Sequence, residues 1–348
     1  MAQHAYVESS PVQSVASSLA NLPEADVLIY GSPQKIFHEA APKVIDATEV
    51  AKMRTSFDDI KKSVGIDPSA IDYLVIAIRF HKPAADLSFV APDVMIAFGG
   101  DFSSASLLET AKVYLQDKLR DETYGSKTIS IMTVDEIAEA SVKNPLLKSF
   151  TEIGAVPLTA NSIAVGNIRY LKAAIDVADG KGTRLQAGAL DSLLRDQNAL
   201  ISAAGSPISA FMKSFGMLGT ETTARESRCD THFGDFYGAV SSTATHFSVR
   251  GAMNTDNPDT AKIINNLFAG LWQQMIESVS DDKSAQTVLK AIRIVPKDNE
   301  IVWEADIANQ TVADFIKEQT KPKPPPAAEA SKPAPVRKPT PRRRRPRA

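Results

Sequence analysis

The segment FYGAVSSTATHFSVRGAM, residues 236–253, decides the fold class. From Phe247 to Met253 every second residue is apolar or small, whereas His246, Ser248 and Arg250 occupy the opposite phase. A period of two is typical of a strand with one buried and one solvated face. The short link after 236–241 joins two such strands as an antiparallel pair. The segment therefore favours an α+β fold over a doubly wound parallel one.

The same order of elements can be followed in the other half of the chain. There the strand pair is Ile71–Phe80 and Val94–Phe98. In each half the longest helix follows the pair, and apolar residues at three- and four-residue steps predict it at Ser104–Leu119 and at Asp259–Val279. Asn257 supplies a cap and the next residue a first-turn proline for the second of these helices, as residues 101–104 supply caps for the first.

Further elements extend this correspondence to both ends of each half. Each half is predicted to open with a strand and a helix: strand Asp26–Tyr30 with a helix through Phe37, and strand Ser162–Val165 with a helix through Ala178. Additional helices are predicted at Val50–Val64, at Leu190–Leu194 and around Phe211. Each half is predicted to close with a strand and a helix, Lys127–Met132 with Val134–Ala140 and Glu300–Asp306 with Thr311–Lys317, and Val288–Val295 is an added hairpin partner in the second half. We therefore predict an α+β protein of two tandem related modules, 22–150 and 151–320, with mainly antiparallel sheets packed by amphipathic helices. A flexible segment, 1–21, precedes them and a disordered tail, 321–348, follows.

Charge is distributed unevenly, although the net charge of the 348 residues is only −2. Residues 321–348 contain ten Lys or Arg and one acid, which leaves 29 basic and 40 acidic residues in the first 320, so the body carries −11 and the tail +9. The tail also holds nine of the 21 prolines and no aromatic residue. Since proline removes amide donors and like charges repel, the tail should be an extended, polyproline-biased arm.

Basic residues of this arm are the candidate binding residues of the chain. They are Arg337, Lys338, Arg342, Arg343, Arg344, Arg345 and Arg347. Because arginine binds phosphate or carboxylate in bidentate fashion and stays charged, we expect the tail to bind a polyanion, which could be nucleic acid, an anionic lipid or a cell-envelope polymer. Two alternatives remain open: the tail only keeps the body soluble, or it folds back on the acidic body.

Features that report on the compartment are few. The single cysteine, Cys229, excludes an intrachain disulfide. No apolar run approaches the roughly 20 residues that a membrane helix requires, so no transmembrane segment is predicted. The N-terminus has neither the basic start nor the apolar core of a secretion signal. We expect a cytoplasmic protein if this N-terminus is complete, and a cell-envelope protein if a signal peptide has been omitted.

No residue is predicted to be catalytic, to hold a cofactor or to bind a metal. Cys229 and His232, with His246 further along, form the one Cys/His neighbourhood, but their spacing matches no zinc pattern. Asp230 would also oppose the lowered pKa that a nucleophilic thiol needs. We interpret Cys229 as a loop residue.

Two glycine-containing loops superficially resemble phosphate-binding loops. Residues 99–104, GGDFSS, lie between a strand and a helix but lack the P-loop lysine and the Rossmann glycine spacing. Residues 124–128, YGSKT, precede a strand, whereas a P-loop ending must precede a helix. The first is interpreted as a turn with a helix cap and the second as a hairpin turn.

The remaining candidates are carboxylate pairs and isolated polar residues. The pairs, Asp58 with Asp59, Asp281 with Asp282, and Glu304 with Asp306, are interpreted as solvated acids of an acidic body. Ser206 is not in a Gly-x-Ser-x-Gly nucleophile elbow. His38 is interpreted as a helix-surface or core histidine, and Trp272 and Trp303 as core residues.

Several segments resemble a group of uncharacterised bacterial proteins that end in a similar Lys/Pro/Arg-rich tail. These segments are LPEADVLIYGSPQKIFHEAAPKVI, FDDIKKSVGID, GGDFSSASLLETAKVYL, SRCDTHFGDFYGAV and NPDTAKIINNL. The resemblance covers nearly the whole body, and it implies no activity, substrate or catalytic residue. Members of such groups often begin with a secretion signal, from which this chain departs.

Together these features favour a non-enzymatic binding or scaffold protein with a polyanion-binding tail and no cofactor. The alternative is a hydrolase with its site between the two modules. A pocket with converging Asp, Glu, His or Arg would favour the hydrolase, and shallow wet surfaces would favour the scaffold. The sequence leaves the oligomeric state open.

Overall fold

A computed structural model describes residues 15–16, 18–65, 67–81, 92–133, 152–206 and 233–320. Its strands are β1 (Val27–Gly31), β2 (Ile71–Arg79), β3 (Asp93–Gly100), β4 (Leu119–Tyr124), β5 (Lys127–Thr133), β6 (Glu152–Thr159), β7 (Ser162–Gly166), β8 (Ala199–Gly205), β9 (Phe233–Ser242), β10 (His246–Thr255), β11 (Arg293–Lys297) and β12 (Glu300–Ala308). The helices are α2 (Pro33–Lys35), the π-helical η1 (Ile36–Ala40), α3 (Ala41–Val44), α4 (Ala47–Val64), the 3-10 helix η2 (Pro68–Ala70), α5 (Ser104–Leu115), the 3-10 helix η3 (Gln116–Lys118), α7 (Ile168–Ala178), α8 (Ala187–Leu193), α10 (Pro258–Ser278), α11 (Lys283–Ala291) and α12 (Asn309–Gln319).

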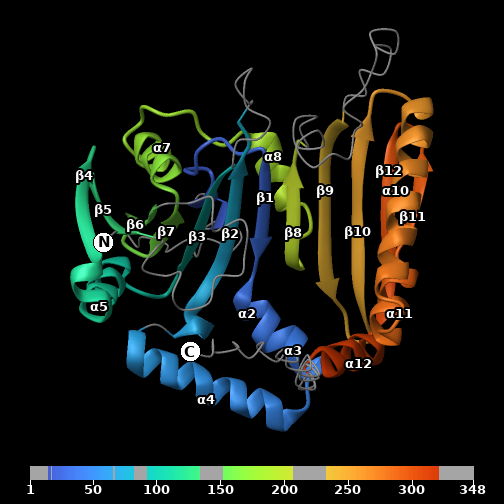
Figure 1. The fold of residues 1–348 in the computed structure, drawn as a ribbon, viewed down its shortest axis with the longest axis horizontal. Coiled ribbons are helices and arrows are strands. Elements are labelled where there is room, and N and C mark those ends of the chain that lie inside the picture. The colour runs from blue at the N-terminus through green and yellow to red at the C-terminus, as the bar shows by residue number, and fades with distance from the viewer. Residues whose placement is uncertain are drawn as a thin grey trace, which may run out of the picture.

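All of these strands join one antiparallel sheet (Figure 1), in the order β11-β12-β10-β9-β8-β1-β2-β3-β7-β6-β5-β4. The predicted α+β class and antiparallel pairing are thus confirmed. Strands from 22–150 and from 151–320 interleave, because β1 pairs with β8 and β3 with β7. The boundary at residue 150 therefore does not divide the sheet in two, and the relation of the two ranges as repeats stays a prediction.

The main core lies on one face of the central strands. Val75 of β2 and Met95 of β3 are fully buried there, under Leu171 and Ile175 of α7 and Leu193 of α8. Leu19 and Leu22 complete this core from the N-terminal side, with 1% and 2% of their surface exposed. The described part of 1–21, which we predicted to be flexible, is therefore packed against the sheet.

Two smaller hydrophobic clusters lie outside the main core. Ala261 and Ile264 of α10 pack on Met253 of β10 and Ile301 of β12. The caps predicted for α10 are present, since the side chain of Asn257 accepts from the amides of residues 259 and 260. Ala40, Leu200 and Phe247 form a third cluster, which joins η1 to β8 and β10. No helix in the described ranges has both the length and the apolar character required to cross a membrane.

Several predicted bounds were wrong for identifiable reasons. The helix expected through Leu119 ends at Leu115, because Gln116 adopts a φ of 46°, outside the helical region, and Leu119 begins β4. The first half of the strand expected at Val288–Val295 is instead the end of helix α11, whose N-cap residue Asp282 accepts from the amide of Ala285. The hairpin partner is β11, which begins at Arg293. The predictions at 134–140 and around Phe211 lie outside the described residues.

Trp303 of β12 packs against glycines of the next two strands of the sheet, β10 and β9. Gly251 of β10 is opposite Trp303 in the register and is opposite Gly238 of β9 on its other side. A Cβ placed on Gly251 would overlap the indole ring, and one on Gly238 would come within 3.2 Å of the indole Nε1. The alternation that predicted β10 thus includes a position that must remain without a side chain.

We expect Gly251→Ala to destabilise the protein by about 1–3 kcal/mol, as overpacking of a filled site does. Urea unfolding followed by tryptophan fluorescence measures this. Gly188→Ala is the control, because a Cβ on Gly188 meets no atom within 4 Å. Equal free energies of unfolding for the two variants would contradict the packing argument.

Candidate functional site

Irregular backbone from three elements converges where β1 ends. The chain continues from β1 through α2 into η1, a π-helical turn of five residues. The pairing of β2 with β3 shifts register at Asp72, and that of β8 with β9 shifts at Leu200. Both positions contact the same residue, because the Ser32 amide donates to the Leu200 carbonyl at 2.9 Å and the Ser32 hydroxyl lies 3.5 Å from the Asp72 carbonyl. Bulges and π-helical turns are frequent beside functional sites, since both re-aim side chains.

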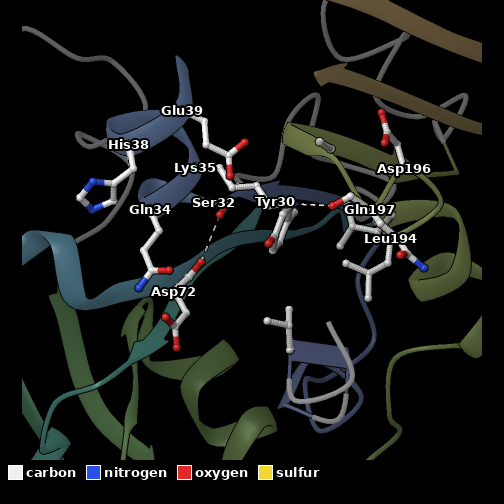
Figure 2. A pocket seen from close by; sticks show the side chains of 13 residues that line it. Tyr30, Ser32, Gln34, Lys35, His38, Glu39, Asp72, Leu194, Asp196 and Gln197 are labelled. Atoms are coloured by element: carbon white, nitrogen blue, oxygen red, sulfur yellow. Dashed lines mark hydrogen bonds between the residues drawn. The ribbon is translucent and has the colours of Figure 1, made fainter. Parts of the chain in front are cut away.

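A cavity of about 300 Å³ opens at this point (Figure 2). We call it the β1 pocket, and its lining residues are Val15, Tyr30, Ser32, Gln34, Lys35, His38, Glu39, Asp72, Leu193, Leu194, Asp196, Gln197 and Ala199. In Figure 2 the ring of Tyr30 lies between Asp72 on one side and Leu194 on the other. The pocket is thus formed by residues from both predicted modules.

The charged groups of the pocket are mostly without counter-ions. Glu39, Asp72 and Asp196 form no ion pair within the described residues. Lys35 directs its ammonium group to the backbone carbonyl of Gln197 instead of to a carboxylate. Partial burial raises the pKa of the Asp72 carboxyl, and the nearby charge of Asp101 adds to this rise. Burial also raises the pKa of the Tyr30 hydroxyl, which therefore stays protonated at neutral pH.

A second cluster surrounds a buried carboxylate at the opposite end of the same strands. Asp93, at the start of β3, has 3% of its side chain exposed and accepts from Arg169 Nε and Nη2 at 3.0 and 2.7 Å. His81 Nε2 lies 2.6 Å from Asp93 Oδ2, and the Asn167 amide group also donates to Asp93. Asn167 in turn accepts from the Val94 amide at 3.2 Å. These bonds link the end of β2, the start of β3 and the first turn of α7.

The hydrogen bonds to Asp93 lower the pKa of its carboxyl by more than burial raises it. Burial alone would raise its pKa, but Arg169, His81 and Asn167 hold the pKa of this carboxyl below its usual range. A His–Asp contact occurs in catalytic triads, where the other imidazole nitrogen faces a nucleophile. No hydroxyl or thiol group contacts His81 among the described residues. We therefore interpret the cluster as a structural link that joins β2, β3 and α7.

The sequence candidates fall mostly at structural positions. Gly125 forms the turn between β4 and β5, so the hairpin interpretation of 124–128 is confirmed. Ser103 caps α5 at the Ser106 amide, as expected for a turn with a helix cap at 99–104. Asp306 binds Arg250, Ser206 binds Asp235, and His246 contacts Thr243 and Thr245. Cys229, His232 and the seven basic residues of the tail lie outside the described residues.

The other two acid pairs also lie at structural positions. Asp59 of α4 forms an exposed ion pair with Lys62 at 3.6 Å. Asp282 caps α11. His38 is an exposed residue of the helical turn η1, as expected for a helix-surface histidine, and it also lines the β1 pocket. No group of three or more His, Cys, Asp or Glu residues that could hold a metal ion occurs in the part of the chain that the structure describes.

Sequence reasoning missed the residues that converge at both sites. Tyr30, Glu39, Asp72 and Asp196 carry no motif, and they meet only because β1 pairs with both β2 and β8. For Asp93 a signal existed. It shares the alternating phase of Met95 and Ala97, both buried, so a charged partner should have been expected for it.

Comparison with known proteins gives no assigned relative. No protein-family profile matches the chain, and no curated protein matches it. Three crystal forms of a protein named TP0453 are similar in structure. Form III has a TM-score of 0.42 at 9% identity over 86% of this chain and 97% of that one. Form IV has 0.40 at 9% over 86% and 95%, and form I has 0.39 at 9% over 90% and 98%. A likeness of this size carries no argument about function.

Proposed function

We propose that the protein is a non-enzymatic binding or scaffold protein whose basic tail engages a polyanion. The observation that carries the proposal is the division of charge, −11 in the first 320 residues and +9 in the last 28. The residues assigned to binding are Arg337, Lys338, Arg342, Arg343, Arg344, Arg345 and Arg347.

The ion pairs of the body support placing the interaction in the tail. Five arginines of the described residues are engaged by carboxylates of the body: Arg79, Arg120, Arg169, Arg250 and Arg293. Basic side chains that are already paired offer little to an added polyanion, and an acidic body repels it. The net positive charge that could attract a polyanion is therefore that of the tail, +9, against −11 for the body.

Retention on heparin tests this proposal. We expect the full chain to be retained at low salt, and a full-length variant with all ten Lys and Arg of 321–348 replaced by glutamine to pass through. A second chain, ending at Thr320, should pass through as well. A variant of the body that removes cations, Lys52→Gln with Lys262→Gln, is the control and should be retained like the native chain. Equal retention of the native and glutamine-tail chains would refute the proposal.

A hydrolase is the second candidate, and one observation favours it. The β1 pocket is lined by Glu39, Asp72 and His38 from the first predicted module and by residues of the second. Paired carboxylates are the groups used for acid–base hydrolysis. A screen of nitrophenyl esters, phosphates and glycosides tests this reading. Hydrolysis that is lost in both Glu39→Gln and Asp72→Asn would support it, and a screen without turnover would exclude these substrate classes.

A further inference from the structure

We propose that the β1 pocket binds an ammonium or guanidinium group carried on a short aliphatic stem. The pocket is a separate site from the tail, so this inference does not depend on polyanion binding. It assigns to the pocket a cationic ligand about the size of an amino-acid side chain.

Uncompensated negative charge is the first argument. Glu39, Asp72 and Asp196 reach the cavity from η1, β2 and the turn before β8. Some acids of the described body have counter-ions, such as Asp121 with Lys112 at 2.9 Å and Glu122 with Lys172 at 2.6 Å, whereas these three have none among the described residues. Three carboxylates that line one cavity without a counter-ion give it a negative potential, which favours a bound cation.

The position of Lys35 strengthens this argument. It is the one lysine that lines the pocket, and its ammonium group is held by the Gln197 carbonyl at the rim. It is therefore not committed to neutralising the carboxylates. The three acids and one lysine that line the pocket carry a summed charge of −2.

The size and the apolar wall of the pocket restrict the ligand further. A volume of about 300 Å³ lies at the lower end of the range for small-molecule sites, and excludes a bulky ligand. Leu193, Leu194 and the ring of Tyr30 form an apolar wall beside the acids. Such a combination suits the side chains of arginine and lysine, or an amine of similar length, in which an apolar stem carries a charged head.

Two sources can supply this chemistry, namely the basic tail of the same chain and a free cationic ligand. The probe that we choose is butylguanidinium, with neutral butylurea as the ligand of matched shape. Ligand-observed NMR titrations would be run on the full chain, on the full-length glutamine-tail variant, and on the double variant Glu39→Gln with Asp72→Asn. Asp259→Asn with Glu109→Gln removes the same charge from exposed helix positions and is the matched control; these two residues are 87% and 73% exposed.

We expect butylguanidinium to bind and butylurea not to bind. The pocket variant should bind about tenfold more weakly, equivalent to roughly 1.4 kcal/mol, and the control variant should bind as the native chain does. Tighter binding to the glutamine-tail variant than to the native chain would identify the tail as the occupant. Equal binding by those two chains would identify a free cation. Absence of binding, equal binding of butylurea, or full binding by the pocket variant would overturn the proposal.

Discussion

Arg169→Met should destabilise the protein by about 2–3 kcal/mol, more than loss of a surface ion pair and less than loss of a fully buried one. The reason is that the substitution leaves the Asp93 carboxylate, 3% exposed, without its bidentate partner. Arg169 itself is 63% exposed, so the native pair gains less than a fully desolvated one. Methionine keeps most of the length of the arginine stem, which limits the loss of packing. Urea unfolding at neutral pH gives the difference in free energy.

A matched pair elsewhere in the sheet provides the control. Arg250 Nη2 contacts both carboxylate oxygens of Asp306 at 2.7 and 2.8 Å, but Asp306 is 52% exposed. Arg250→Met should therefore destabilise by less than about 1 kcal/mol, as is usual for surface pairs. If the two variants lose equal stability, the burial of Asp93 is not what makes its ion pair important.

The pH dependence of the same pair follows from the lowered pKa of Asp93. A carboxyl whose pKa is lower in the folded state than in the unfolded state adds stability above the unfolded pKa, about 3.9 for Asp. That contribution is lost as pH falls through the folded pKa. Since Arg169 contributes to the lowered pKa, the stability difference between native protein and Arg169→Met should be constant from pH 7 to about pH 5 and shrink below about pH 4. A difference that grows on acidification would contradict this assignment.

Local signals in the sequence were sufficient for much of the fold. The alternation in β10 and the Asn257 cap of α10 involve neighbouring residues, and both predictions are confirmed. The strand β4 was missed because Leu119 continues the helical spacing of α5, and only the φ of 46° at Gln116 breaks it. The π-helical turn η1 has no recognisable sequence pattern, since its residues also fit an ordinary helix.

The β1 pocket and the Asp93 cluster could not be predicted from the sequence, because both depend on contacts between residues far apart in the chain. The β1 pocket exists because β1 pairs with β8, whose residues are some 170 positions later in the chain, at Ile29 with Ala203 for example. The Asp93 cluster joins residues 12 and 76 positions apart. Such contacts depend on how the whole sheet packs, so they cannot be predicted from the spacing of residue types along the chain.

Salt dependence is the second large effect, and it follows from the five guanidinium groups among residues 342–347. Each arginine that neutralises a phosphate releases condensed counter-ions, so binding weakens as salt rises. If all five take part, the log–log slope should be about −3.5 on single-stranded nucleic acid, or roughly a hundredfold loss of affinity between 50 and 200 mM salt. Because the tail contains no aromatic residue to stack on bases, oligonucleotides of different sequence should bind equally.

The measurement that tests the central proposal most directly is this salt titration, made with a fluorescent single-stranded oligonucleotide on the full chain and on the full-length glutamine-tail variant. The account predicts a steep negative slope for the native chain and no measurable binding for the variant at any salt concentration. Binding by the variant with the same affinity and slope would place the interaction on the acidic body. Absence of binding by both chains would show that the tail does not bind this polyanion. Either result contradicts the proposed function.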